Sequence, residues 1–114
     1  MKGFVKVMRA LSDPNRVKII KMLQHKTMCV CEMQAALRIA QSSVSKHLKI
    51  LEEAGLVDYA KDGLWVNYHL TDGRSSPYAA SILGNIRHWL EDNAEVRELL
   101  ERIPSIRRED ICKR

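Results

Sequence analysis

The N-terminal half of the chain repeats apolar residues with the period of an α-helix. Residues 2–11 place them every three or four positions, and Asp13 followed by Pro14 has the form of a second helix start, a capping residue before a first-turn proline. The helix that begins there carries one apolar face, formed by Val17, Ile20 and Leu23. A third, short helix is predicted at about residues 29–38.

A fourth helix follows the polar run "AQSS" and stops at Gly55, a residue that commonly ends helices. Its buried side is predicted to consist of Val44, Leu48 and Leu51, which stand at i, i+4 and i+7. Two β-rich runs, "LVDYA" and "LWVNYHL", then flank an Asp62-Gly63 turn signal, and this arrangement predicts a hairpin.

The C-terminal third is predicted to form one long helix or two consecutive helices over residues 78–103, where apolar side chains return at helical spacing until Pro104. Residues 104–114 are charged and are predicted to form a flexible tail. The whole pattern predicts a mainly α protein with one β-hairpin and a single domain over residues 1–103.

Composition narrows the class of protein only slightly. A chain of 114 residues fits one small domain, which hides little apolar surface unless it dimerises. No apolar run reaches the roughly 18 residues needed to cross a membrane, so we expect a cytoplasmic protein without a membrane partner. The net charge of +5 favours a polyanionic partner weakly. Three cysteines, an odd number, argue against a disulfide framework and leave thiols available for other chemistry.

The order of the predicted elements is that of a winged helix-turn-helix, in which the second of two short helices enters the major groove of DNA and the following hairpin rests on the backbone. The outward side chains of that helix can hydrogen-bond to bases and phosphates; they are Gln41, Ser42, Ser43, Ser45, Lys46, His47 and Lys49. Lys61 at the hairpin tip is a further candidate for a phosphate contact. The alternative is a face that is merely solvated, and it is strongest for His47 and Lys61.

The segments "ALSDPNRVKIIKML", "CVCEMQAAL" and "QSSVSKHLKILEEAGLVDYAKDGLWVNYHL" resemble the ArsR/SmtB family of bacterial metal-responsive repressors, over about residues 5–103. The resemblance implies a homodimer, joined mainly through its first and last helices, that binds double-stranded operator DNA of dyad symmetry and leaves it when an inducer binds. The apolar stripes on residues 2–11 and 78–103 suit a dimer, because each needs a partner.

Two other classes are supported less well. An enzyme is disfavoured because the chain has no nucleotide-binding loop and no Ser/His/Asp set. An interaction module that has lost DNA binding is suggested only by the acidic balance of residues 42–70.

The segment "CVCE" begins the predicted third helix. Relatives without a metal site there often begin this helix Ser-x-x-Glu, a capping box, so Cys29 stands in the capping position. Cysteine caps a helix less well than serine, at a cost of about 1 kcal/mol, which suggests another use for the thiol. The unpaired N–H groups and the helix dipole favour a thiolate, so we expect Cys29 and Cys31 to be good nucleophiles and soft-metal ligands.

Three interpretations of this pair stay open. The thiols act as small hydrophobes, or one is oxidised and pairs with Cys112 or with a second subunit, since a disulfide between residues two apart is strained. In the third interpretation the two thiolates hold a thiophilic ion. The resemblance favours the third, because Cys-Val-Cys before an acidic residue is similar to the branch that binds As(III) or Sb(III) through three sulfurs. A related branch binds Cd(II) or Pb(II).

The third ligand is left open. Some arsenic repressors have a third thiol where this chain has Gln34, and no cysteine precedes the pair. Cys112 is the one remaining thiol, either a ligand or an idle tail residue. His25 could join a Zn(II) or Cd(II) site or lie in solvent. The family's second sensing site, on the last helix, is not expected, because His88 and Glu91 supply only half of it.

Overall fold

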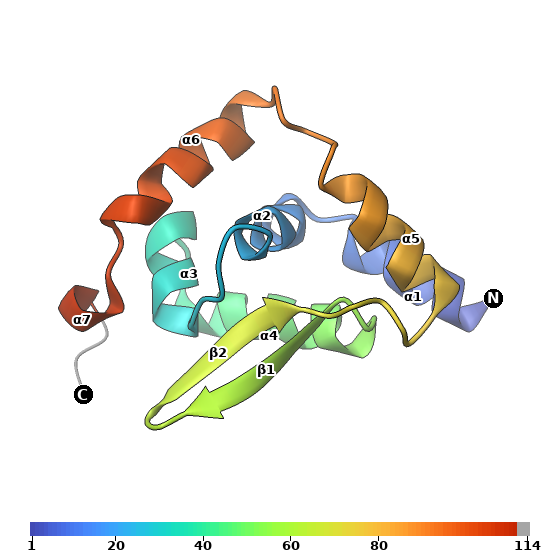
Figure 1. The fold of residues 1–114 in the computed structure, drawn as a ribbon, viewed down its shortest axis with the longest axis horizontal. Helices are drawn as coiled ribbons and strands as arrows, with labels where there is room; N and C mark the ends of the chain where they lie inside the picture. The colour runs from blue at the N-terminus through green and yellow to red at the C-terminus, as the bar shows by residue number, and fades with distance from the viewer. Residues whose placement is uncertain (112–114) are drawn as a thin grey trace.

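The computed structural model describes residues 1–111 and consists mainly of helices with one antiparallel hairpin, which confirms the predicted fold class (Figure 1). In chain order the elements are α1 (Lys2–Ala10), α2 (Pro14–Leu23), α3 (Val30–Leu37), α4 (Gln41–Glu53), β1 (Val57–Asp62), β2 (Trp65–Leu70), α5 (Pro77–Ile86), α6 (Ala94–Arg102), η1 (Ile103–Ser105) and α7 (Arg108–Ile111). The succession from α3 to β2 is that of a winged helix-turn-helix.

Local signals account for the helix boundaries. The carboxylate of Asp13 accepts hydrogen bonds from the backbone N–H groups of Asn15 at 2.8 Å and Arg16 at 3.3 Å, and Pro14 occupies the first turn of α2. Beyond α4, Gly55 has a φ of 79°, the left-handed conformation that favours glycine after a helix. The predicted start of α2 and the predicted stop of α4 are therefore confirmed.

Helix α2 lies in the middle of the molecule, with other helices around it (Figure 1). All five residues from Ile19 to Leu23 are buried, so α2 packs on more than the single apolar face that its periodicity predicts. The largest fully buried apolar side chains come from several elements; they are Ile19, Ile20, Met22, Met28, Met33, Leu48, Leu51, Leu56 and Leu99. This core packs α3 and α4 against α2 and fixes the helix pair expected to read DNA.

The hairpin turn lies one residue beyond the predicted Asp62-Gly63 signal. Asp62 pairs with Trp65, so Gly63 and Leu64 form the two-residue loop. Gly63 has a φ of 64°, as the first residue of such a loop requires in a tight hairpin. The glycine was therefore identified correctly, and its position in the turn was not.

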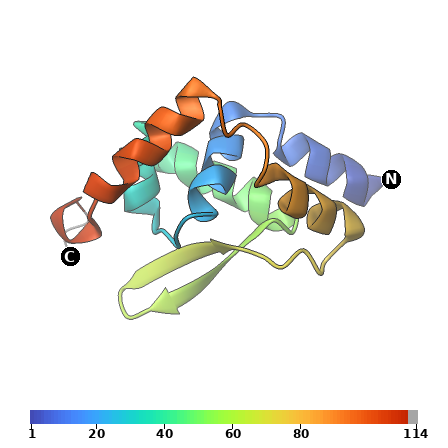
Figure 2. The ribbon, with the colours of Figure 1, turned by 45° about the horizontal axis from the view of Figure 1, so that its top comes forward.

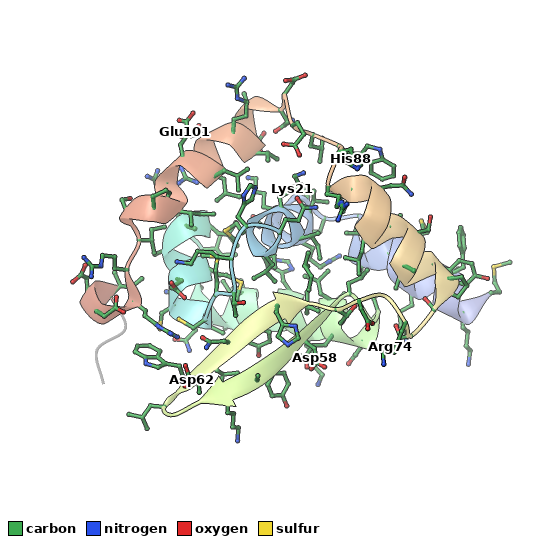
Figure 3. The ribbon with its side chains drawn as sticks, in the orientation of Figure 1. Lys21, Asp58, Asp62, Arg74, His88 and Glu101 are labelled. Atoms are coloured by element: carbon green, nitrogen blue, oxygen red, sulfur yellow. The ribbon has the colours of Figure 1, made fainter. Side chains whose placement is uncertain are left out.

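The C-terminal region forms two helices, the second of the two predicted alternatives. Helix α5 lies beside α1, and α6 crosses α2 and α3 at the opposite end (Figures 1 and 2). The break between them is held by Lys21, which is fully buried in the middle of the molecule (Figure 3). Its ammonium donates to the carbonyls of Ile86 at 3.1 Å and Trp89 at 2.9 Å and lies 3.4 Å from the carboxylate of Glu91.

The residues after α6 run along α3 to the hairpin. The guanidinium of Arg102 donates to the carbonyl of Ala36 at 2.9 Å, next to the C-terminal end of α3. The guanidinium of Arg108 donates to Asn67 at 2.7 Å and lies 4.7 Å from the ring centroid of Trp65. Helix α7 packs against α3, so the described part of the predicted tail is in contact with α3 and β2, and its flexibility stays a prediction.

Large apolar side chains are exposed on α1 and in the C-terminal region, as the predicted unpartnered stripes require; they are Phe4, Val5, Met8, Tyr78, Trp89 and Leu90. The rings of Phe4 and Tyr78 meet edge to face with centroids 5.4 Å apart, which joins the two stripes. Within residues 1–111, no helix combines the length and the apolar content that a membrane crossing needs.

Candidate nucleic-acid interface and thiol site

Helix α4 presents the polar face that its sequence predicts. Val44, Leu48 and Leu51 are fully buried, and five of the candidate DNA contacts on the opposite side are exposed, namely Gln41, Ser42, Ser45, Lys46 and Lys49. Ser43 and His47 are half-buried. The exposed set carries the hydroxyl, amide and ammonium groups that hydrogen-bond to phosphates and base edges.

The N-terminal end of α4 is open to a ligand. Its N-cap residue is Ala40, whose side chain cannot accept a hydrogen bond, so no capping side chain occupies the first N–H groups of the helix. The turn from α3 into α4 passes through Arg38, whose φ of 59° ends α3 in the left-handed conformation. Uncapped N–H groups beside Ser42 suit an anionic phosphate.

His47 makes a contact with another helix that its sequence position does not predict. Its Nδ1 atom lies 3.2 Å from Nη1 of Arg16, a residue of α2 that is 31 positions earlier in the chain. The imidazole is therefore held against the helix that supports α4, and its side chain is only partly outward. Arg16 was not among the candidate residues, and the sequence carries no local signal for this contact.

Lys61 lies on β1 next to the hairpin tip and is exposed. Two carboxylates, Asp58 and Asp62, lie on the same strand, where Figure 3 labels them. The hairpin is thus not a basic surface, and a phosphate contact from Lys61 stays a prediction.

Cys29 caps α3 in the position that its sequence spacing predicts. Its backbone N–H donates to Oε1 of Glu32 at 2.9 Å, and its sulfur faces the backbone N–H of Glu32, so the two residues form a reciprocal capping box. The second carboxylate oxygen of Glu32 lies 3.4 Å from the ammonium of Lys26. Cys29 and Glu32 are both buried, at 3% and 5% exposure.

Burial reverses the expected acidity of Cys29. Removal from water disfavours the thiolate and raises the pKa of the thiol, and the negative charge of Glu32 raises it further. The hydrogen bond from the backbone N–H of Glu32 acts in the opposite direction and does not outweigh them. The expectation of a readily formed thiolate at Cys29 was therefore wrong, because it considered the helix start and not the surrounding core.

Cys31 has different surroundings from Cys29. It is half-buried and lines a groove with Gln34, Ala35, Arg38, Ile39 and Ile111 on the outer side of α3, and it is disulfide-bonded in this structure. Cys112, the predicted third ligand, lies outside the described residues. Among residues 1–111, no three His, Cys, Asp or Glu side chains gather in a set that could hold a metal ion.

The thiol site is joined directly to the elements predicted to contact DNA. Met28, the residue before the cap, exchanges two backbone hydrogen bonds with Tyr68 of β2, at 3.1 and 2.8 Å. Helix α3 also packs against α4, and its Met33 is buried in the core that the two helices share with the rest of the fold. A change in the backbone at Cys29 would therefore act on both the hairpin and α4.

The remaining candidate ligands lie apart from this site. His25 is exposed in the turn after α2. His88 is exposed beyond α5, far from the hairpin tip marked by Asp62 (Figure 3). Glu91, its expected partner in the family's second sensing site, is the carboxylate that faces Lys21.

Comparison with known proteins agrees with this architecture. Residues 13–59, from the start of α2 into β1, match the family described as bacterial regulatory protein, arsR family. An uncharacterized HTH-type transcriptional regulator of Methanocaldococcus jannaschii is 39% identical over 69 residues, which cover 60% of this chain and 78% of that protein. The arsenical resistance operon repressor of Escherichia coli is 35% identical over 68 residues, 59% of this chain and 58% of that protein, so the match spans little more than half of the repressor.

Among solved structures, the transcriptional regulator HlyU from Vibrio vulnificus superposes with a TM-score of 0.61 and 30% identity, covering 76% of this chain and 85% of that one. This match covers a larger share of the chain than residues 13–59. The chain therefore belongs to the ArsR family of bacterial helix-turn-helix transcriptional regulators.

Proposed function

We propose that this chain is a homodimeric, cytoplasmic repressor that binds operator DNA through α4 and releases it when a thiophilic metal(loid) binds Cys29 and Cys31. As(III) and Sb(III) are the favoured inducers, and Cd(II) and Pb(II) are the alternatives. The observation that carries the proposal is the placement of Cys29 as the cap of α3, between the hairpin and α4. The similarity to an arsenical resistance operon repressor and to cadmium resistance regulatory proteins supports a thiophilic inducer, and the Cys-Val-Cys pair favours As(III) and Sb(III) among them.

The residues present fit a soft ion in part. Two sulfurs one residue apart at a helix start are the ligands that a thiophilic ion prefers. The proposal concerns the protein with both thiols reduced, and the third ligand is either Cys112 or a small thiol from solution. When bound, the ion would draw the sulfur of Cys29 away from the N–H of Glu32.

Loss of the cap is large enough to matter. Removing a helix cap costs about 1 kcal/mol, and a coupling free energy of about 1–3 kcal/mol between inducer and DNA corresponds to a 5- to 150-fold loss of affinity. The backbone pairing of Met28 with Tyr68 and the packing of α3 on α4 would pass the distortion to both DNA-contacting elements. The sulfur of Cys29 would not bind the ion and cap α3 at the same time, so ion binding and the capped position of α3 would exclude one another.

The exposed apolar stripe on α1 and α5 supports the dimer. Phe4 and Tyr78 are exposed and in contact with one another, and a second copy would cover such a surface. A two-fold dimer implies an operator with half-sites about 34 Å apart, or a multiple of that spacing. Sedimentation of the protein alone and with a palindromic DNA fragment would measure both stoichiometries.

The deciding experiment is fluorescence anisotropy of the reduced protein on its own upstream DNA, titrated with each ion. Wild type should bind and then release, whereas Cys29→Ser and Cys31→Ser should bind without releasing. Cys112→Ser separates a protein third ligand from an exogenous one. Lys46→Ala should weaken binding without changing the response, with Lys2→Ala as a control at an exposed lysine of α1. Unchanged release by both single cysteine variants would contradict the proposal.

A thiol redox or persulfide sensor on the same scaffold is the second candidate, and the disulfide at Cys31 favours it. In that case oxidation rather than an ion would change operator affinity. Mass spectrometry of the oxidised protein would identify the linked cysteines, and anisotropy before and after treatment with dithiothreitol would measure the effect. Equal affinities of the oxidised and reduced forms would exclude this candidate.

A further inference from the structure

Arg16 makes three contacts from a single guanidinium. Its Nε donates to the carbonyl of Ala10 at 2.7 Å and its Nη2 to the carbonyl of Arg9 at 3.3 Å, both at the C-terminal end of α1. Its Nη1 lies 3.2 Å from Nδ1 of His47 on α4. One half-buried side chain of α2 thus joins α1 to the helix expected to read DNA.

The chemistry of arginine selects the tautomer of the neutral imidazole. A guanidinium has five N–H donors and no acceptor, so the ring nitrogen that faces it must accept. Nδ1 of His47 therefore carries no proton, and the neutral ring carries its proton on Nε2. The half-buried imidazole then offers outward one donor, Nε2–H, and no acceptor.

His47 lies on α4 where the Nε2–H group of this tautomer could reach DNA. His47 follows Lys46 directly and stands one turn after Ser43, at the border between the buried stripe and the exposed face of α4. Phosphate oxygens and the N7 atoms of purines are acceptors that an N–H donor can recognise, whereas the opposite tautomer would present a lone pair to them.

We propose that Arg16 is a positioning residue for DNA recognition: it anchors α4 to the end of α1 and holds His47 as the Nε2–H tautomer, which donates to an acceptor on DNA. The inference rests on the proposed DNA-binding function. Arg16, on α2 and bonded to the end of α1, would then set two things: the orientation of α4 about its axis, and which ring nitrogen of His47 donates a hydrogen bond.

The first test uses the protein without DNA. Long-range ¹H–¹⁵N correlation spectra of ¹⁵N-histidine-labelled protein should show His47 with an unprotonated Nδ1 and a protonated Nε2. In Arg16→Met no donor faces Nδ1, so a mixture of tautomers is expected. Arg87→Met, at an exposed arginine beyond α5, is the matched control and should leave the spectrum of His47 unchanged. A wild-type ring protonated on Nδ1 would overturn the proposal.

The second test is a double-variant cycle measured by operator anisotropy. Arg16→Met and His47→Ala should each weaken binding about 3- to 10-fold, and the double variant should lose little more than either one, because Arg16 acts through His47. Fully additive losses would overturn the role of Arg16 while leaving the proposed function intact. Failure of wild type to bind its upstream DNA would instead overturn the proposed function and the recognition role together.

DNA analogues identify the acceptor. Replacing operator purines by 7-deazapurines removes the base acceptor, and methylphosphonate linkages remove the phosphate acceptor. The analogue that abolishes the difference between wild type and His47→Ala marks the atom contacted. If neither analogue does so at any operator position, the donor role of His47 is wrong.

Discussion

The carboxylate of Glu32 holds the start of α3, and its replacement by alanine tests the capping box quantitatively. The change leaves the buried N–H of Cys29 without its acceptor, which costs about 1–3 kcal/mol. It also removes a negative charge from the helix N-terminus, worth about 0.3–1 kcal/mol. The contact with Lys26 adds little, because that lysine is 44% exposed. We expect the free energy of unfolding to fall by about 2–3 kcal/mol.

Urea denaturation followed by circular dichroism measures this loss. With a slope of about 1.5 kcal/mol per molar urea, the midpoint for Glu32→Ala should fall by about 1.3–2 M. Glu32→Gln keeps an acceptor for the N–H and should lose about 1 kcal/mol or less. Glu101→Ala, at an exposed position of α6 (Figure 3), should change stability by less than about 0.5 kcal/mol. Equal protein concentrations are needed, because a dimer's stability depends on concentration. A glutamine variant as unstable as the alanine variant would refute the capping-box argument.

Three further predictions concern other parts of the fold. Gly73→Ala should lower the free energy of unfolding by about 2–3 kcal/mol, because φ is 77° and the new Cβ would lie 2.5 Å from the backbone of α5. Its control is Gly84→Ala, which lies in open space within α5 and should raise the free energy of unfolding by about 0.5–1 kcal/mol in the same urea assay. Glu32→Gln removes a negative charge that raises the pKa of Cys29, so alkylation of Cys29 by iodoacetamide at pH 8 should accelerate about two- to fivefold. An unchanged alkylation rate would contradict the electrostatic argument. Arg108→Met should increase acrylamide quenching of Trp65 fluorescence, because the guanidinium that covers the ring is lost. The measurement uses protein in which the other tryptophan is replaced by phenylalanine. An unchanged quenching constant would show that this contact is not kept in solution.

Features that depend on neighbouring residues were predicted well from the sequence. The cap at Asp13, the box at Cys29 and the stop at Gly55 each involve residues within a few positions of one another. The polar face of α4 follows from a 3.6-residue period and needed no knowledge of the rest of the fold. Winged helix-turn-helix architecture then followed from the order of these elements.

Features that depend on distant residues were not predictable in the same way. The break between α5 and α6 coincides with the buried ammonium of Lys21, which is more than 60 residues earlier in the chain. The half-buried state of His47 comes from Arg16 on another helix. Burial of Cys29 reversed the expected direction of its pKa shift, because the cost of desolvating a thiolate is set by the core and not by the helix start.

Under the proposed function, the burial of Cys29 has a consequence for selectivity. A cap thiol with a raised pKa is protonated at neutral pH and reacts slowly with weak or oxygen-preferring partners. An ion whose bonds to sulfur are strong can displace the proton, and it must also move the sulfur out of the box and expose the N–H of Glu32. If the DNA-bound conformation is the one in which the box is intact, the proposal requires that the ion bind it more weakly than a conformation in which the box is open. That difference in affinity is what couples inducer to operator, because a ligand with equal affinity for both conformations would shift neither.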